Sequence, residues 1–159
     1  FIEPSQSIRS LGVKLKLNAN KSLIKNKEIV LIDDSLVRGT TCHKIVKMLY
    51  DAGAKEVHVR IACPEIIYPD YYGVDMPTKK ELLANEKNNE QMCDYIKAKS
   101  LKFLSIEGLY KALGQGPRNK NYPQFSDHYF TGDYPIKPSD LLEKGKITQL
   151  SLLSGKSNN

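Results

Sequence analysis

Apolar and polar positions up to Leu113 alternate between strand-like and helix-like periods. The unbroken apolar run Ile29–Ile32, rich in β-branched residues, predicts a strand buried on both faces. Helical spacing follows at Ile45, Val46, Met48, Leu49 and Ala52, and Gly53 stands where a helix C-terminal glycine belongs. Residues 55–62 alternate again as a strand. A strand, a helix and a strand in about 35 residues form a βαβ unit, which predicts an α/β fold with a parallel sheet.

The same periods predict further elements on both sides of this unit. Alternation over residues 11–17 predicts a half-buried strand, and the polar stretch 22–27 a connection into the central strand. Residues 63–77, rich in proline and tyrosine, predict an ordered loop packed by its aromatic rings. Thr78–Glu81 forms a capping-box pattern that opens a short helix.

Beyond that helix we expect a second helix, a third strand and a last helix. Asn89 is the expected N-cap of the second helix, whose inner face would hold Met92, Tyr95 and Ile96. Leu101–Leu104 is the expected third strand. Ser105 is expected to cap the last helix, which ends at Gly114 and turns four side chains inward: Ile106, Leu109, Tyr110 and Leu113.

Composition changes at Gly114, where prolines and polar residues become frequent. We therefore expect one domain over residues 1–113 and an irregular C-terminal extension over 114–159 that is loop-rich or partly disordered. Asp140–Leu153 could add a short helix or strand. Because the chain begins at Phe1 without methionine and shows no obvious first strand, we expect it to be part of a longer protein.

The net charge of +6 does not predict a nucleic-acid partner. Only four of the 24 basic residues are arginines, and the lysines are spread along the chain without interleaved stacking aromatics. The three cysteines, Cys42, Cys63 and Cys93, form no metal-like spacing, and their odd number argues against a disulfide framework. With no signal peptide and no apolar run of about 18 residues, we expect a cytoplasmic protein without a membrane partner.

Residues 33–41 hold the most specific chemistry. Asp33 and Asp34 leave the strand on opposite sides, so one can accept hydrogen bonds from ribose hydroxyls while the other reaches a Mg²⁺ shell or a backbone amide. Gly39 lets the backbone fold around a ligand oxygen. Thr40 and Thr41 add hydroxyl groups at a helix start, where anions bind. The turn therefore suits a sugar phosphate, with Arg38 either contributing or pointing away to hold the loop.

Other interpretations of these residues stay open. Asp33 or Asp34 could be the acceptor of a phospho-acceptor receiver domain, although no lysine follows a late strand in the required context. The Thr40-Thr41 pair could be only a helix cap. The stretch matches neither G-x-x-x-x-G-K-[ST] nor G-x-G-x-x-G, which excludes a nucleotide triphosphatase loop and a dinucleotide fingerprint.

V-L-I-D-D-S-L-V-R-G-T-T resembles the phosphoribosyl pyrophosphate (PRPP) motif of type I phosphoribosyltransferases, and its surroundings are similar to the amidophosphoribosyltransferase family. The similar blocks include A-G-A-K-E-V-H-V-R-I-A-C-P-E-I and L-S-I-E-G-L-Y-K-A-L, and the resemblance covers Phe1 to Leu113. It implies the C-terminal part of a type I phosphoribosyltransferase fold. It also implies transfer of glutamine-derived ammonia to PRPP, which gives 5-phosphoribosylamine in the first step of purine biosynthesis.

The resemblance also implies roles for individual residues. Asp33 and Asp34 would be the catalytic residues and the Mg²⁺ ligands. Asn18 would lie beside the family's mobile loop, although an ordinary turn residue is an equal alternative. Purine nucleotides would be inhibitors that use the same phosphate site, and the whole protein would be a homo-oligomer. The residues expected to bind PRPP or its phosphate are Asp33, Asp34, Ser35, Val37, Arg38, Gly39, Thr40 and Thr41.

The chain departs from the family's pattern in two ways. By comparison with that pattern, the glutaminase domain with its cysteine nucleophile and the first part of the transferase domain are missing. We therefore expect the chain to be inactive alone. The alternative is a non-catalytic module that senses PRPP or a purine nucleotide. Some family members hold an iron–sulfur cluster, but Asp70 stands in one cysteine position and residues 115–132 contain no cysteine, so we expect none here.

Overall fold

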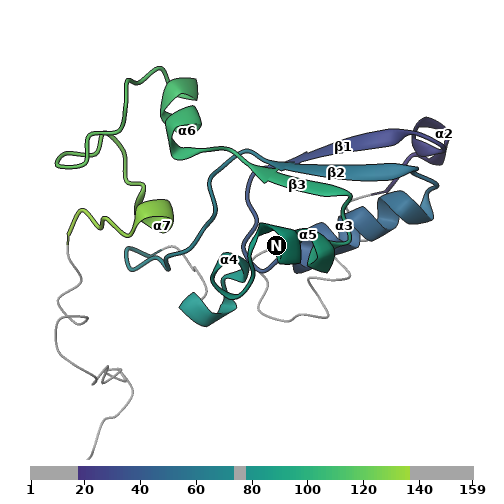
Figure 1. Ribbon diagram of the computed structural model, residues 1–159, viewed down its shortest axis with the longest axis horizontal. Helices are drawn as coiled ribbons and strands as arrows, with labels where there is room; N and C mark the ends of the chain where they lie inside the picture. Colours follow the sequence, from purple (N-terminus) through teal and green to yellow (C-terminus); the bar gives the residue numbers. More distant parts are fainter. Residues whose placement is uncertain (1–17, 74–77, 137–159) are drawn as a thin grey trace, which may run out of the picture.

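The computed structural model describes residues 18–73 and 78–136. Its centre is a three-stranded parallel sheet in the order β1-β2-β3 (Figure 1), formed by β1 (Glu28–Asp33), β2 (Glu56–Ile61) and β3 (Ser100–Phe103). Asp33 pairs with Ile61, and Ile61 pairs with Phe103, so the three strands end at one edge. The predicted α/β fold with a βαβ unit is confirmed.

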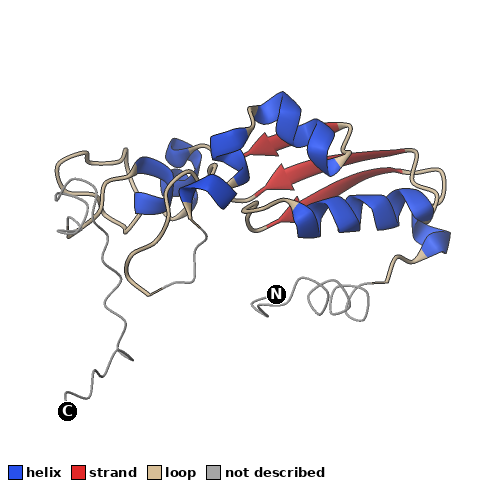
Figure 2. Ribbon diagram, turned by 90° about the horizontal axis from the view of Figure 1, so that it is seen from below, coloured by secondary structure: helices blue, strands red, loops and turns tan. Residues whose placement is uncertain are grey.

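Two helices cover one face of the sheet. α3 (Thr40–Asp51) and α5 (Asn89–Ile96) lie below the sheet in Figure 1, and Figure 2 shows them from their own side. The core between these layers consists of apolar side chains at most 8% exposed, among them Val46, Leu49, Val57, Val59, Ile61, Met92, Ile96 and Leu101. Burial of this apolar surface is the main force that holds the layers together.

The prediction that β1 is buried on both faces is wrong. Val30 and Ile32 are 59% and 72% exposed, whereas Ile29 and Leu31 pack against the core. The reason is the position of the strand: β1 is an edge strand among the described residues, and its alternate side chains point to the face opposite α3 and α5. The apolar run read alone could not show which face would lack a cover.

The polar stretch before β1 contains the short helix α2 (Lys21–Ile24), which Asn20 caps through its side chain. Gly53, at φ 94°, ends α3 as predicted. The capping box at Thr78 and Glu81 is also confirmed, but it opens only the 3-10 helix η1 (Lys79–Glu81), and α4 (Leu83–Glu86) follows after an extended Leu82.

Other boundaries differ by small amounts. Asn88, not Asn89, caps α5, because Asn88 Oδ1 accepts the Gln91 N–H at 2.9 Å while Gln91 Oε1 accepts the Asn88 N–H at 3.0 Å. On the predicted inner face of α5, Met92 and Ile96 are buried but Tyr95 is 37% exposed. The predictions for residues 11–17 and Asp140–Leu153 lie outside the described residues.

Ser105 caps α6 (Ile106–Ala112) as predicted. Of the four side chains expected to face inward, Tyr110 is fully buried, but Leu113 is 53% exposed because it lies after the last helical residue. None of the helices in residues 18–73 and 78–136 is long and apolar enough to span a membrane.

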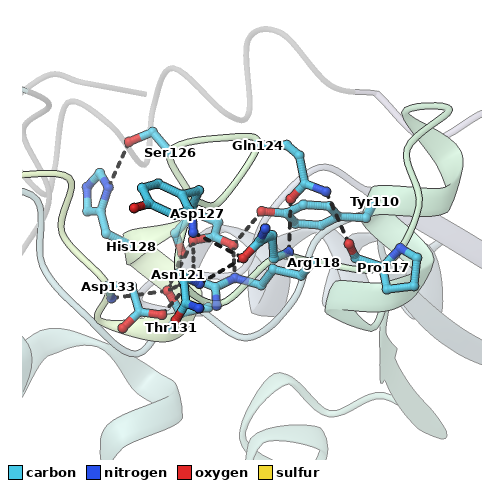
Figure 3. Close-up of polar contacts among 12 residues, drawn as sticks. Tyr110, Pro117, Arg118, Asn121, Gln124, Ser126, Asp127, His128, Thr131 and Asp133 are labelled. Carbon is cyan, nitrogen blue, oxygen red and sulfur yellow. Dashed lines mark hydrogen bonds and ion pairs between the residues drawn. The ribbon is translucent and has the colours of Figure 1, made fainter.

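Residues 114–136 are tied to the rest of the chain by buried polar groups (Figure 3). Arg118 binds Asp127 at 3.0 Å, and Asp127 also accepts a hydrogen bond from Tyr110 of α6 at 2.8 Å. His128, which begins α7 (His128–Thr131), contacts Asp70 at 2.7 Å. These contacts join the extension both to α6 and to the loop after β2.

The loop after β2 is packed by its aromatic rings in its described part, as predicted. Tyr71 lies 5.2 Å from Tyr134, and Tyr72 lies edge-on to His128 at 5.1 Å between ring centroids. Aromatic pairs at these separations stabilise the contact beyond simple burial. The loop therefore forms the surface on which α7 and the residues after it pack.

Candidate functional site

The β1–α3 turn, residues 33–41, brings two neighbouring carboxylates to the carboxyl end of β1. Asp33 is half-buried and its carbonyl accepts the Ala62 N–H at 2.9 Å, whereas Asp34 is exposed. Asp33 Oδ1 accepts the Asp34 N–H at 3.0 Å, and Asp34 Oδ1 accepts the Ser35 hydroxyl at 2.8 Å. The carboxylates thus differ in environment although they are adjacent in sequence.

Burial raises the pKa of Asp33, and the charge of Asp34 adds to this rise, while the hydrogen bond from the Asp34 amide opposes it. Protein groups therefore compensate the ionised carboxylate incompletely, and a cation or a pair of hydroxyl donors would stabilise it. Burial also raises the pKa of Cys42 to about 12 and that of Cys63 to about 11. Both thiols stay protonated at neutral pH and are poor nucleophiles.

Backbone amides line the other side of the turn. Gly39 has φ 75° and precedes the first residue of α3, and its carbonyl accepts the His43 N–H at 2.9 Å. The N–H groups of residues 37–41 donate to no acceptor within the described ranges. Amides without a described acceptor at the start of a twelve-residue helix, where the helix dipole is positive, are groups of the kind that bind anions.

Arg38 points toward Glu81, not toward these amides. Its Nη2 lies 3.2 Å from Glu81 Oε1, and both side chains are about half exposed. Next to it, the Val37 carbonyl accepts the Leu83 N–H at 2.9 Å. The Arg38 side chain is therefore paired with a distant segment, and its part in PRPP binding stays a prediction.

Comparison with known proteins agrees with this geometry, although no family model matches the chain. The chain is 54% identical over 155 residues to amidophosphoribosyltransferase of Rhizobium etli, which covers 97% of this chain. It is 52% identical over 140 residues, or 88% of the chain, to chloroplastic amidophosphoribosyltransferase 2 of Arabidopsis thaliana. The chain belongs to the amidophosphoribosyltransferase family.

A solved structure extends this similarity to the fold. The glutamine PRPP amidotransferase of B. subtilis, complexed with ADP and GMP, superposes with a TM-score of 0.70 at 45% identity over 85% of this chain. The chain spans 31% of the length of the Rhizobium relative, 24% of the Arabidopsis relative and 30% of the B. subtilis protein. Both the predicted family and the predicted α/β architecture are therefore confirmed.

Asn18 is expected beside the family's mobile loop. No contact among the described residues brings it to the β1–α3 turn. It is exposed and precedes α2, which lies at the opposite end of the sheet from the turn (Figure 1). β1 spans about 20 Å at six residues, and it separates α2 from Asp33. The role of Asn18 stays a prediction.

A second group of possible metal ligands lies at the amino ends of the strands. Glu28, Glu56 and His58 place one ligand atom each within 4.8 Å of one another. Lys55 already pairs with Glu28 at 2.9 Å, and Lys99 with Glu56 at 3.2 Å. Because these lysines compensate both carboxylates, the group has less need of a cation than the pair at Asp33.

Three residues that support the turn were not found from sequence: Glu81, Leu83 and Tyr95. A Cβ atom on Gly39 would lie 2.7 Å from Leu83 Cδ2 and 2.9 Å from Tyr95 Cε1. The capping-box pattern located Glu81 at a helix start but could not place it beside a turn 43 positions away. No local signal could have found these contacts.

Gly39→Ala is expected to lower the free energy of unfolding by about 2–4 kcal/mol. The left-handed backbone costs an L-residue about 1–2 kcal/mol, and the new methyl group must displace Leu83 and Tyr95 at about 1–3 kcal/mol. Urea unfolding would measure the change. Gly116→Ala is the matched control, because nothing lies within 4 Å of a Cβ there. Equal stability of the two variants would show that the turn adapts freely.

Proposed function

We propose that the β1–α3 turn binds PRPP with Mg²⁺ in the phosphoribosyl-transfer step of amidophosphoribosyltransferase, the first step of purine biosynthesis. In that reaction ammonia released from glutamine attacks C1 of PRPP, pyrophosphate leaves and 5-phosphoribosylamine forms. One arrangement carries the proposal. Two consecutive carboxylates stand at the end of β1, and Gly39, in the left-handed conformation, precedes α3. The N–H groups of residues 37–41 have no acceptor among the described residues.

The turn supplies separate groups for the two parts of the ligand. The amides of residues 37–41 would bind the 5-phosphate, with the hydroxyl groups of Thr40 and Thr41 as further donors, and that of Ser35 if it turns from Asp34 to the ligand. Fixed backbone donors need no reorganisation when the ligand enters, which favours tight binding of an anion. The 5-phosphate would in this way hold the ribose so that its hydroxyls face the carboxylates.

The carboxylates would take the ribose hydroxyls and Mg²⁺. Asp33 suits a cation because its charge is incompletely compensated in the half-buried position, and Asp34 is exposed and accessible to a hydrated ion. When bound, Mg²⁺ would neutralise the pyrophosphate as it leaves. The two aspartates would hold the hydroxyls and keep C1 oriented as positive charge develops on the ribose.

Further parts of the proposal concern the whole protein. The B. subtilis relative is complexed with ADP and GMP, which supports purine nucleotides as inhibitors whose phosphate could occupy the same turn. That complex equally supports a second function, a module that senses PRPP or a purine nucleotide without catalysis. For the whole protein we also propose a glutaminase domain that supplies the ammonia, a homo-oligomeric assembly and a cytoplasmic location. For this chain we propose one domain over residues 1–113, followed by a C-terminal extension.

Isothermal calorimetry with PRPP tests the binding function. We expect binding that strengthens by at least about tenfold when Mg²⁺ is added and that ribose 5-phosphate inhibits by competition. A sugar without phosphate, ribose, is the negative control. A folded protein that gives the same weak heat with PRPP, ribose 5-phosphate and ribose would contradict the proposal.

A further inference from the structure

Residues 78–86, far from the β1–α3 turn in sequence, lie against it through three contacts. Glu81 binds Arg38 at 3.2 Å, the Leu83 N–H donates to the Val37 carbonyl at 2.9 Å, and the Leu83 side chain covers Gly39. Two of these contacts involve the backbone of the turn directly. The position of the turn therefore depends on the position of residues 78–86.

Glu81 joins these two segments through one carboxylate. Its Oε2 accepts the Thr78 N–H at 3.2 Å and the Thr78 hydroxyl at 3.1 Å, while its Oε1 accepts the Arg38 guanidinium. These hydrogen bonds lower the pKa of Glu81, those from Thr78 most, so the carboxylate is ionised at neutral pH. The same group that starts η1 thus holds the side chain of Arg38.

The segment that holds Arg38 is itself well anchored. Leu82 is fully buried and Leu83 is 5% exposed. Asn85 donates hydrogen bonds from Nδ2 to the Ile67 carbonyl at 2.8 Å and to the Lys79 carbonyl at 3.2 Å, which connects the segment to the loop after β2. A fixed support of this kind can transmit its own geometry to the turn.

We propose that Glu81 is a positioning residue for the phosphate site: by holding the Arg38 side chain, it keeps the amides of residues 37–41 in the orientation that receives the phosphate. This inference rests on the proposed function of the turn. It assigns Arg38 an indirect role, in which the guanidinium fixes the backbone and the backbone contacts the ligand. Neither residue is a catalytic residue in this scheme.

The alternative is that Arg38 leaves Glu81 and binds the phosphate itself. Glu81 would then compete with the ligand for the guanidinium, and Glu81→Gln would strengthen PRPP binding. Under the positioning role, Glu81→Gln weakens binding because the turn loses a support. The two schemes therefore predict changes of opposite sign in the dissociation constant.

Calorimetry with PRPP and Mg²⁺ on the full chain distinguishes them, using Arg38→Met, Glu81→Gln and the double variant. We expect each single variant to weaken binding about two- to fivefold, as suits an exposed ion pair, and the double variant to be no weaker than the weaker single variant. The matched control is the exposed Lys47–Asp51 pair on α3, where Lys47→Met and Asp51→Asn should leave binding unchanged. Tighter binding by Glu81→Gln, or additive losses in the double variant, would overturn the proposal.

Hydrogen exchange of the ligand-free chain is a second measurement that needs no PRPP. The amides of residues 37–41 should exchange faster in Glu81→Gln than in the wild type, while the thermal midpoint stays within about 2 °C. Unchanged exchange would overturn the positioning role. If the wild-type chain binds no PRPP but exchange responds to Glu81→Gln, the proposed function fails and the positioning of the turn stands.

Discussion

Asp33→Asn and Asp34→Asn are each expected to weaken Mg²⁺-dependent PRPP binding about 10- to 100-fold. An amide keeps the size of the carboxylate but removes its negative charge, and hydrogen bonds to a charged group contribute about 1.5–3 kcal/mol. The loss at Asp33 should depend most on Mg²⁺. Burial disfavours the ionised form of Asp33 and so raises its pKa, and a bound cation would offset that cost. Calorimetry with and without Mg²⁺ measures both effects.

Stability separates loss of the site from loss of the fold. The pKa of Asp33 is raised on folding, so its ionised form is disfavoured in the folded chain at neutral pH, and Asp33→Asn should raise the thermal midpoint or leave it unchanged. Asp51→Asn, on the exposed side of α3, is the control for a charge change alone. Unchanged PRPP affinity in both site variants would contradict the proposed site.

Arg118→Met is expected to lower the free energy of unfolding by about 3–5 kcal/mol. The substitution leaves Asp127, which is 3% exposed, with Tyr110 and Thr131 as its remaining side-chain partners. Removal of one partner from a buried ion pair leaves an uncompensated charge, which costs about this much. Asp133 also loses its contact with Arg118 at 2.7 Å. Chemical denaturation of the chain measures the loss.

The pH dependence of the same variant provides an internal check. Burial raises the pKa of Asp127, but hydrogen bonds from Arg118 and Tyr110 outweigh it, so the pKa in the folded chain lies below the ordinary value. The ion pair therefore contributes fully above the unfolded pKa of about 4, and its contribution is lost as the pH falls through the lowered folded value.

The wild type and Arg118→Met should accordingly converge in stability at low pH. Lys120→Met, at an exposed position two residues away, controls for loss of a positive charge and should change stability by less than about 0.5 kcal/mol. A constant difference between wild type and Arg118→Met from pH 7 to pH 2 would show that the loss comes from packing and not from the ion pair.

Local signals predicted the part of the fold that depends on neighbours in sequence. The apolar run before Asp33, the helical spacing after Thr41 and the glycine at position 53 each specify a backbone conformation over a few residues, and the structure contains all three. The Thr78 capping box succeeded for the same reason, since its partners are three residues apart. The Asn89 prediction missed by one residue because either asparagine satisfies the pattern.

Long-range contacts could not be read in this way. The exposure of Val30 and Ile32 depends on which elements cover a sheet face, and Leu113 faces solvent although its spacing suits the inner face of α6. Arg118 and Asp127 occupy a stretch whose composition indicated an irregular extension, yet they form a buried ion pair. In each case the deciding neighbour is a side chain that no local period specifies.

By itself, the sequence determined the strand–turn–helix of residues 28–51, its two carboxylates, its glycine and the family to which the chain belongs. Tertiary structure decided how that turn is supported: Arg38 reaches Glu81, Val37 accepts a hydrogen bond from Leu83, and Gly39 lies under Leu83 and Tyr95. The physical reason is one of range. Backbone conformation follows from adjacent residues, whereas the partner of a side chain depends on which distant segment the folded core places beside it.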